Sequence, residues 1–271
     1  KQSYEAYGNI GESDYLSFGL KENRYSKDGT MVSLGEIDLR DMTVDESGNF
    51  ILYIGGKTNS KNFLPLPKNA NMLIVRQTYK NRILQTHAKI NIKTSNASPI
   101  PEPLTAVKLE NQLNQSLAFV SGTASTFLRW VHEFKKNHLN QLPLGDQDFF
   151  QAAGGDPKIC YLHGYFDFDY DEYMEITTEI PDCEYWNFQL ENHWMESLDY
   201  RHYPIHINES SADLNKDKSI TINVSHSPEK LKNNLITEGR KNGAMLLRWI
   251  GATSFPIPTV EIKKLNSLQD R

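Results

Sequence analysis

The densest group of side chains suited to acid–base chemistry lies in the stretch Glu191–His206. The unperturbed pKa of histidine lies near neutral pH, so an imidazole beside a carboxylate can act as a general base. Within this stretch two carboxylates stand between two imidazoles, and these four are the candidate catalytic residues: His193, Glu196, Asp199 and His202. The alternative for the same stretch is a long solvated connection that Trp194 holds in place.

Side chains suited to ligand contact accompany this group. Tryptophan offers a broad apolar ring, and arginine binds anions through paired N–H donors. The candidate ligand-binding residues are His163, Trp186, Trp194, Arg201, Arg248 and Trp249. We expect a cleft near residues 191–206, lined by aromatic rings such as those of Trp186, Trp194 and Trp249.

A metal site and a cofactor site are not predicted. His202 and His206 stand four apart, but Pro204 between them excludes a regular helix. In a strand they would lie roughly 13 Å apart, too far to share one ion. The sequence also contains no P-loop, dinucleotide fingerprint or Gly-x-Ser-x-Gly elbow, and we predict no cofactor.

Composition limits the classes of partner. The 271 residues carry a net charge of −5, whereas a protein that binds nucleic acid through its phosphates normally has a basic surplus. No apolar run is long enough to cross a bilayer, so neither nucleic acid nor a membrane span is expected. A small-molecule or glycan ligand and a homo-oligomer stay open as partners. The chain starts at Lys1, so we expect missing upstream sequence and leave the compartment open.

The elements that must position these residues occur twice. Tyr15–Leu20 resembles Tyr185–Leu190, and Asn62 precedes Met72–Gln77 much as Asn233 precedes Met245–Trp249. Between these landmarks each copy has a turn and a strand, and after them an alternating strand. The expected strands are 50–54, 72–75 and 88–93 in the first copy, and 220–224, 245–247 and 258–263 in the second. We expect Met72–Val75 and Met245–Leu247 to be buried on both faces, and 161–166 to be the counterpart of 4–10.

The middle of the chain is helical in pattern. Thr105 is a predicted N-cap for a helix with leucines at spacing four, namely Leu109, Leu113 and Leu117. We expect Ser121–Thr123 to end this helix and a second helix to carry Phe127, Val131 and Phe134. Asp146 is expected to cap a short third helix, which the glycines at 154 and 155 end.

Two sets of residues resemble a known family. They are Asn62-Phe-Leu-Pro-Leu-Pro followed by Leu-Ile-Val-Arg76, and Trp186 followed by Asn233 and Leu-Leu-Arg-Trp249. This pattern is similar to the DUF1214 family, and the likeness runs from Tyr15 to the C-terminus. It implies a β-sandwich or jelly-roll-like fold and implies no activity. Asn234 and Ile236 depart from the usual pattern, and relatives carry sequence before the point where this chain begins.

The two copies differ after the repeated aromatic strand. Only the second carries the His- and Trp-rich stretch, so the second copy is the better candidate for a site. Arg76 and Arg248, by contrast, occupy equivalent positions. We interpret them as internal clamps to partners such as Asn62 and Asn233, with anion binding as the alternative.

We therefore predict a mainly β chain of two jelly-roll or β-sandwich-like modules joined by a helical insert, α+β overall. The expected boundaries are 1–98, 99–157 and 158–271. The leading functional hypothesis is a small-molecule or glycan binding or assembly module. The alternative is a hydrolase or lyase that uses a His–carboxylate pair from the 191–206 loop, with Arg248 steadying an anionic substrate.

Overall fold

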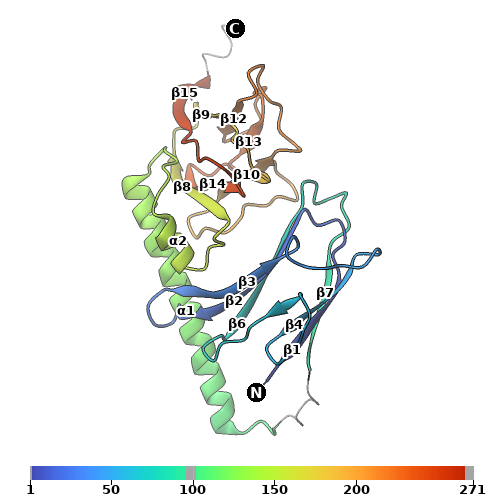
Figure 1. Cartoon of the computed structure of the whole chain (residues 1–271). Helices are drawn as coiled ribbons and strands as arrows, with labels where there is room; N and C mark the ends of the chain where they lie inside the picture. The colour runs from blue at the N-terminus through green and yellow to red at the C-terminus, as the bar shows by residue number, and fades with distance from the viewer. Residues whose placement is uncertain (1, 96–99, 101, 266–271) are drawn as a thin grey trace. The chain divides into compact units, whose positions relative to one another are not determined.

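The chain folds into two compact, mainly β units that a long helix links. The computed structural model describes residues 2–95, 100 and 102–265. The first unit comprises residues 1–122 with 152–154, and the second comprises residues 123–151 with 155–271. The expected module boundary after residue 98 lies outside the described residues. Strands of each unit form two sheets (Figure 1).

The first unit is a sandwich of two sheets. Sheet 1a has the order β5 (Phe63–Leu64), β4 (Asn49–Ile54), β1 (Tyr4–Asn9) and β7 (Lys89–Thr94). Sheet 1b has the order β3 (Met31–Asp38), β2 (Tyr15–Asn23) and β6 (Met72–Thr78). Alternate residues of both sheets meet in one apolar core, in which Leu16, Phe18 and Leu52 are fully buried.

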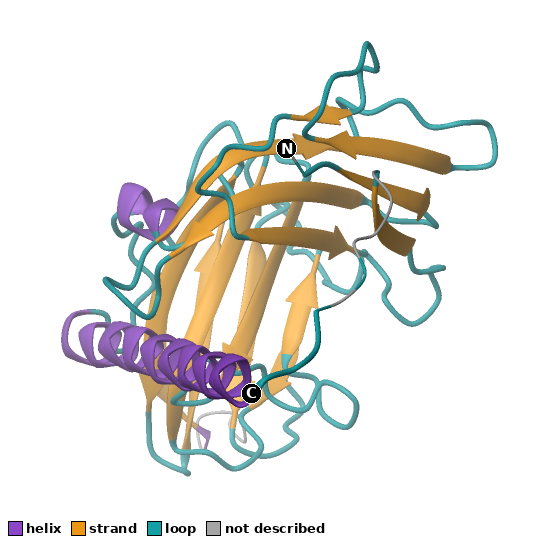
Figure 2. Ribbon diagram, turned by 90° about the horizontal axis from the view of Figure 1, so that it is seen from below, coloured by secondary structure: helices purple, strands orange, loops and turns teal. Residues whose placement is uncertain are grey.

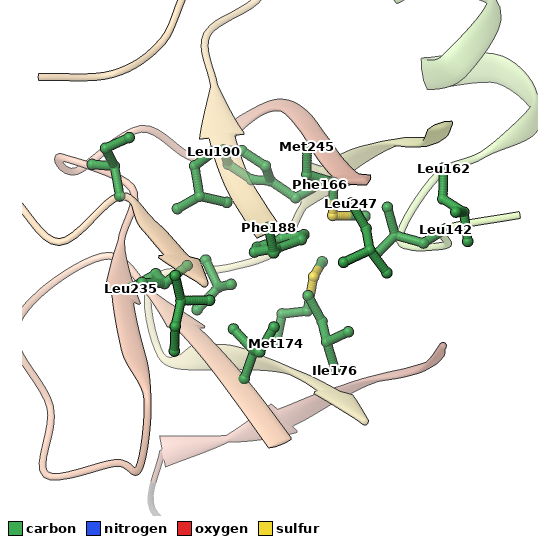
Figure 3. Close-up of a cluster of buried hydrophobic side chains, with 14 of the residues drawn as sticks. Leu142, Leu162, Phe166, Met174, Ile176, Phe188, Leu190, Leu235, Met245 and Leu247 are labelled. Carbon is green, nitrogen blue, oxygen red and sulfur yellow. The ribbon is translucent and has the colours of Figure 1, made fainter. Parts of the chain in front are cut away.

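The second unit repeats this plan with one more strand. Sheet 2a has the order β13 (Asn234–Ile236), β12 (Ile220–Ser225), β9 (Glu172–Thr178) and β15 (Thr259–Lys264). Sheet 2b has the order β11 (His206–Asn208), β10 (Tyr185–Glu191), β14 (Asn242–Ile250) and β8 (Ile159–Asp167). Figure 3 shows the core between them, where Phe188 and Leu247 of sheet 2b face Met174 and Ile176 of sheet 2a.

The repeat is visible in the hydrogen bonds of two asparagines. The side chain of Asn62 accepts a bond from the Thr43 N–H and donates to the carbonyls of Thr43 and Ile51. Asn233 bonds in the same way to the N–H and carbonyl of Asp213 and to the carbonyl of Thr221, the counterpart residues. These bonds tie the segment before the turn to β4 or β12. Both asparagines therefore belong to the strands and turns that the two units have in common, called the shared frame below.

One expected strand equivalence is wrong. β1 lies between β4 and β7, and the strand in the same place of the second unit is β9, between β12 and β15. The counterpart of residues 4–10 is therefore Glu172–Thr178, not 161–166. The strand that contains 161–166 is β8, which pairs with β14 and has no counterpart in the first unit among the described residues.

The extra strand also changes the burial of the matched strands β6 and β14. Residues of β14 between Gly243 and Leu247 are all buried, as expected for a strand with neighbours on both sides. Residues Met72–Arg76 of β6 are only half-buried, so the expectation of burial on both faces is wrong there. β6 is an edge strand because no equivalent of β8 pairs with it.

The helical segment has two helices, not three. α1 (Ala106–Asn137) continues through Ser121–Thr123, where the sequence predicts a break, and is unbroken in Figure 2. Gly122 has a packing role: a Cβ atom there would lie 2.4 Å from the backbone oxygen of Tyr25. Thr105 and Asp146 cap α1 and α2 (Gln147–Ala152) as expected. The leucines at spacing four are exposed, Leu117 at 68%.

Candidate functional site

The outer face of sheet 2b, opposite the sandwich core, carries several polar side chains in neighbouring rows. Successive residues of a strand point to opposite faces, and neighbouring strands lie about 4.8 Å apart, so residues in register are within reach of one another. Across β8, β14 and β10 the registered rows on this face are Tyr161–Arg248–Asn187, His163–Leu246–Gln189 and Tyr165–Ala244–Glu191.

His163 lies within a group of aromatic rings on this face. Its imidazole stacks on Phe134 of α1, with ring centres 4.9 Å apart, and its centre lies 4.7 Å from that of Phe150 of α2. Burial, together with the positive charge of Arg248, lowers the pKa of His163 to about 3, so the ring is neutral at physiological pH. Its Nδ1 is buried and has no hydrogen-bond partner within the described residues.

Glu191 is a buried carboxyl group, 3% exposed, on the next row. The Gln189 amide donates a 2.6 Å bond to its Oε1, while Oε2 is buried and lacks a partner within the described residues. Burial raises the pKa of Glu191, although Arg248 and the bond from Gln189 oppose the shift. Arg248 is half-buried and donates to the Gln189 side-chain oxygen at 3.2 Å. A buried carboxyl group with a raised pKa and a half-buried guanidinium thus face the same surface.

Tyr165 links this face to the predicted loop. Its hydroxyl donates to Oδ1 of Asn242 at 2.8 Å and lies 2.9 Å from Nδ1 of His193. Burial, with His132 and Lys135 of α1 nearby, lowers the pKa of His193. His193 is therefore the one candidate catalytic residue of the loop that reaches the outer face of sheet 2b.

The other three candidate catalytic residues do not converge with it. The carboxylate of Asp199 accepts bonds of 2.9 and 2.8 Å from Arg201, which lowers its pKa to about 2. The carboxylate of Glu196 accepts a bond from Asn192, and both Glu196 and His202 are exposed. Asp199 and Arg201 line a shallow hollow of about 510 Å³ whose lining does not include His193, Glu196 or His202. Within the described residues the imidazoles of His193 and His202 form no hydrogen bond to the carboxylate of Glu196 or Asp199, although the charge of His202 contributes to the lowered pKa of Asp199.

The candidate tryptophans are divided between the core and the surface. Trp186 and Trp249 are 2% and 0% exposed, and their rings pack 6.3 Å apart in the sandwich core. Trp194 is 53% exposed. The expected cleft lined by three tryptophans is not formed. Side chains alternate between the two faces of a strand, and Trp186 and Trp249 lie on the core face of sheet 2b and not on its outer face.

The expected arginine clamps have other partners. Arg76 is opposite Ser17 in the sheet and Arg248 is opposite Asn187, so the two arginines are equivalent as predicted. Arg76 donates to the carbonyl of Gly154 at 2.6 Å, and Arg248 donates to Gln189. The expected partners Asn62 and Asn233 instead bond to backbone groups of the shared frame.

Several residues of the outer face were not predicted as site residues. Gln189 and Glu191 follow Asn187 at a spacing of two, which is the signal of one polar face on a strand. The aromatic contribution of Trp130, Phe134 and Phe150 could not be assigned, because helix periodicity does not show which sheet a helix covers. Within the described residues, no group of three His, Cys, Asp or Glu side chains could hold a metal ion.

The fold and this face describe a mainly β protein of two repeated sandwich units, with a buried polar cluster on the second unit. The crystal structure of an uncharacterised protein from Burkholderia cenocepacia matches 98% of this chain and 74% of its own, with 34% identity and a TM-score of 0.93. The chain belongs to the family of that Burkholderia protein.

A second solved structure shares the fold. The VPA0106 protein from Vibrio parahaemolyticus matches over 97% of this chain and 86% of its own, with 12% identity and a TM-score of 0.57. No protein-family model and no curated protein sequence matches the chain. Among the described residues, no helix has the length and apolar character to cross a membrane.

Proposed function

We propose that the outer face of sheet 2b binds a small organic molecule that carries a carboxylate. The observation that carries the proposal is that two buried polar atoms, Oε2 of Glu191 and Nδ1 of His163, have no hydrogen-bond partner within the described residues. Buried polar groups are normally paired, and each exception needs an explanation. The positive charge of the half-buried Arg248 acts on both groups. A bound ligand would supply the missing partners.

The chemistry of the ligand follows from the groups that face it. A guanidinium binds planar anions through two parallel N–H donors. A carboxyl group with a raised pKa can donate a hydrogen bond to a ligand oxygen, and Glu191 has such a pKa. Aromatic rings from Trp130, Phe134 and Phe150 flank His163 and suit a flat apolar body. An aromatic carboxylate fits these features better than a glycan.

Calorimetric titration with benzoate tests the proposal. We expect wild-type protein to bind benzoate and Arg248→Met to weaken binding about tenfold or more. Glu191→Gln keeps a donor at the same place and should retain binding, whereas Glu191→Leu should lose it. Arg201→Met, in the exposed loop, is the matched control and should bind as wild type does. If Arg248→Met binds benzoate as tightly as this control, the proposal fails.

Acid–base catalysis at the same residues is the second candidate. Opposite pKa shifts of two titratable groups in one site are typical of acid–base catalysis, and on this face burial raises the pKa of Glu191 and lowers that of His163. A hydrolase or lyase would use Glu191 as general acid and Arg248 to hold an anionic substrate. Turnover of carboxylate-bearing esters should then disappear in Glu191→Gln while benzoate binding persists. Glu196→Gln is the control and should keep full turnover.

The resemblance to DUF1214 bears on the family to which the chain belongs. The Asn62 and Asn233 segments that resemble DUF1214 include the asparagines of the shared hydrogen-bonded frame. We therefore propose that the family of this chain and the Burkholderia protein is DUF1214, and that its sandwiches are jelly-roll-like. Both solved relatives come from bacteria, which supports a bacterial origin for this chain. A solved structure of a DUF1214 protein that lacks both asparagines at the equivalent positions would contradict the assignment.

A further inference from the structure

The first unit contains an apolar cavity at one end of its sandwich. Its volume is about 500 Å³, within the range of sites that bind drug-sized molecules. Residues from both sheets line it, namely Tyr4, Leu20, Ile54, Met72, Leu73 and Ile92, together with Leu66 from the loop after β5. Leu20 and Ile54 are 3% and 2% exposed, so the inner wall is continuous with the core. The cavity therefore offers an apolar compartment that is open on one side.

The same end of the second unit is filled. Leu20 is opposite Leu73 across β2 and β6, and the equivalent pair across β10 and β14 is Leu190 and Met245. Leu190 and Met245 are both fully buried and belong to the core in Figure 3. The position of the first unit's cavity is thus occupied by protein in the second.

The 191–206 loop supplies the filling side chains. Its Leu198 and Ile205 are 3% and 2% exposed and belong to the second unit's core. Backbone bonds fix both beside Leu190: the Leu190 N–H donates to the carbonyl of Ile205 at 2.9 Å, and the Leu198 N–H donates to the carbonyl of Leu190. The residue opposite Leu20 in the first unit is Gly35, which has no side chain to place there. The fold therefore accepts branched aliphatic groups at this end.

The rim of the cavity adds a charge preference. Lys68 is the only charged residue in the described lining. It is exposed, and within the described residues it forms no ion pair. An unpaired ammonium group at the mouth of an apolar cavity favours a ligand with an anionic end.

We infer that the first unit binds an aliphatic anion, with its hydrocarbon chain in the cavity and its anionic group at Lys68. The hydrocarbon chain takes the place that Leu198 and Ile205 take in the second unit. This site is separate from the proposed carboxylate site on sheet 2b and does not depend on it.

Calorimetric titration of the full chain with decanoate, below its micelle concentration, tests the inference. Wild-type protein should bind decanoate and should bind decanol about fivefold more weakly. Ala70→Trp places an indole in the cavity lining and should weaken decanoate binding at least tenfold. Lys68→Glu should weaken decanoate about fivefold and leave decanol unchanged. Lys61→Glu, an exposed lysine of the same unit outside the lining, should stay within about twofold of wild type.

Three results would overturn the inference. They are no binding of decanoate to the wild type, full binding by an Ala70→Trp variant that melts cooperatively, and equal binding by Lys68→Glu and Lys61→Glu. If Ala70→Trp does not fold, the comparison of the two lysine variants still decides the question, because both side chains are exposed.

Discussion

The two units share a frame but use the end of the sandwich and the outer face of one sheet differently. In the first unit the end of the sandwich is an open cavity beside Leu20, and in the second Leu198 and Ile205 fill it. On the outer face, Lys21 of the first unit is buried and pairs with Glu36, whereas the equivalent Glu191 keeps an unpaired oxygen within the described residues. The two units thus share their strand pairing and differ at the ends and on the outer faces of their sheets.

Removal of a filling side chain should have the largest effect on this comparison. Leu198→Ala would leave a cavity in the second unit's core, because Leu198 is 3% exposed there. We expect a loss of about 3 kcal/mol in the free energy of unfolding, measured by urea denaturation. Leu214→Ala, at a 46% exposed leucine of the same unit, is the control and should change stability by less than about 0.5 kcal/mol. A loss below about 1 kcal/mol for Leu198→Ala would contradict its role as a core residue.

The shared frame can be tested at the paired asparagines. Asn62→Ala removes three hydrogen bonds to backbone groups of residues 43 and 51, and Asn233→Ala removes the three equivalent bonds. Each substitution should cost about 2 kcal/mol, because three hydrogen bonds to backbone groups are lost, and Asn233→Ala should cost more since Asn233 has a positive φ of 50°. Asn69→Ala is the control, since its amide forms an exposed hydrogen bond to the Glu22 side chain. A loss below about 0.5 kcal/mol in either variant would show that its asparagine does not stabilise the frame.

The sequence predicted the repeated frame, since its landmarks are local. The asparagines, the turns and the alternating strands β4, β12, β7 and β15 each have a signal within a few residues. The partners of Arg76 and Arg248 were not predictable, because Gly154 and Gln189 come from distant segments. The expected helix break at Ser121–Thr123 is wrong for a related reason. A glycine can end a helix, but Gly122 instead lets α1 approach the backbone of Tyr25 closely, and Tyr25 is far away in the sequence.

The proposed site lies in the unit that the sequence favours and includes His163 and Arg248, two of the candidate ligand-binding residues, whereas Gln189 and Glu191 were not among the candidates. The histidines and carboxylates of the 191–206 loop led to its prediction as the site. A loop sequence, however, does not show which of its residues enter the core. Leu198 and Ile205 carry its structural role, while Asp199 pairs with Arg201 at the surface. Glu191 and His163 gain their unusual environment from strand register and from helices far away in the sequence.

The neutral state of His163 should make the second unit sensitive to acid. The pKa of His163 is about 3 in the fold, below its ordinary value of 6.5, so between these values the unfolded chain binds a proton that the folded chain does not. Stability from this group is therefore complete above pH 6.5 and is lost as pH falls towards 3. From pH 7.5 to pH 5.5 we expect a loss of about 1.4 kcal/mol, measured by urea denaturation at both values. In His163→Phe the free energy of unfolding should not show this decrease of about 1.4 kcal/mol between the two pH values. His202→Phe, in the exposed loop, should show the same decrease as wild type.

The smallest effect is expected from the ion pair between Asp199 and Arg201, two residues that the sequence analysis named as site candidates. Arg201 and Asp199 are two residues apart on a turn, and the arginine side chain is 70% exposed. Solvent screens such a pair, so Arg201→Ala should leave the melting temperature unchanged within error. Arg248→Ala, which removes the hydrogen bond to Gln189 on sheet 2b, should lower it measurably. Equal melting temperatures of the two variants would mean that Arg248 stabilises the second unit no more than Arg201 does. The loop and the sheet face would then not differ in their contribution to stability.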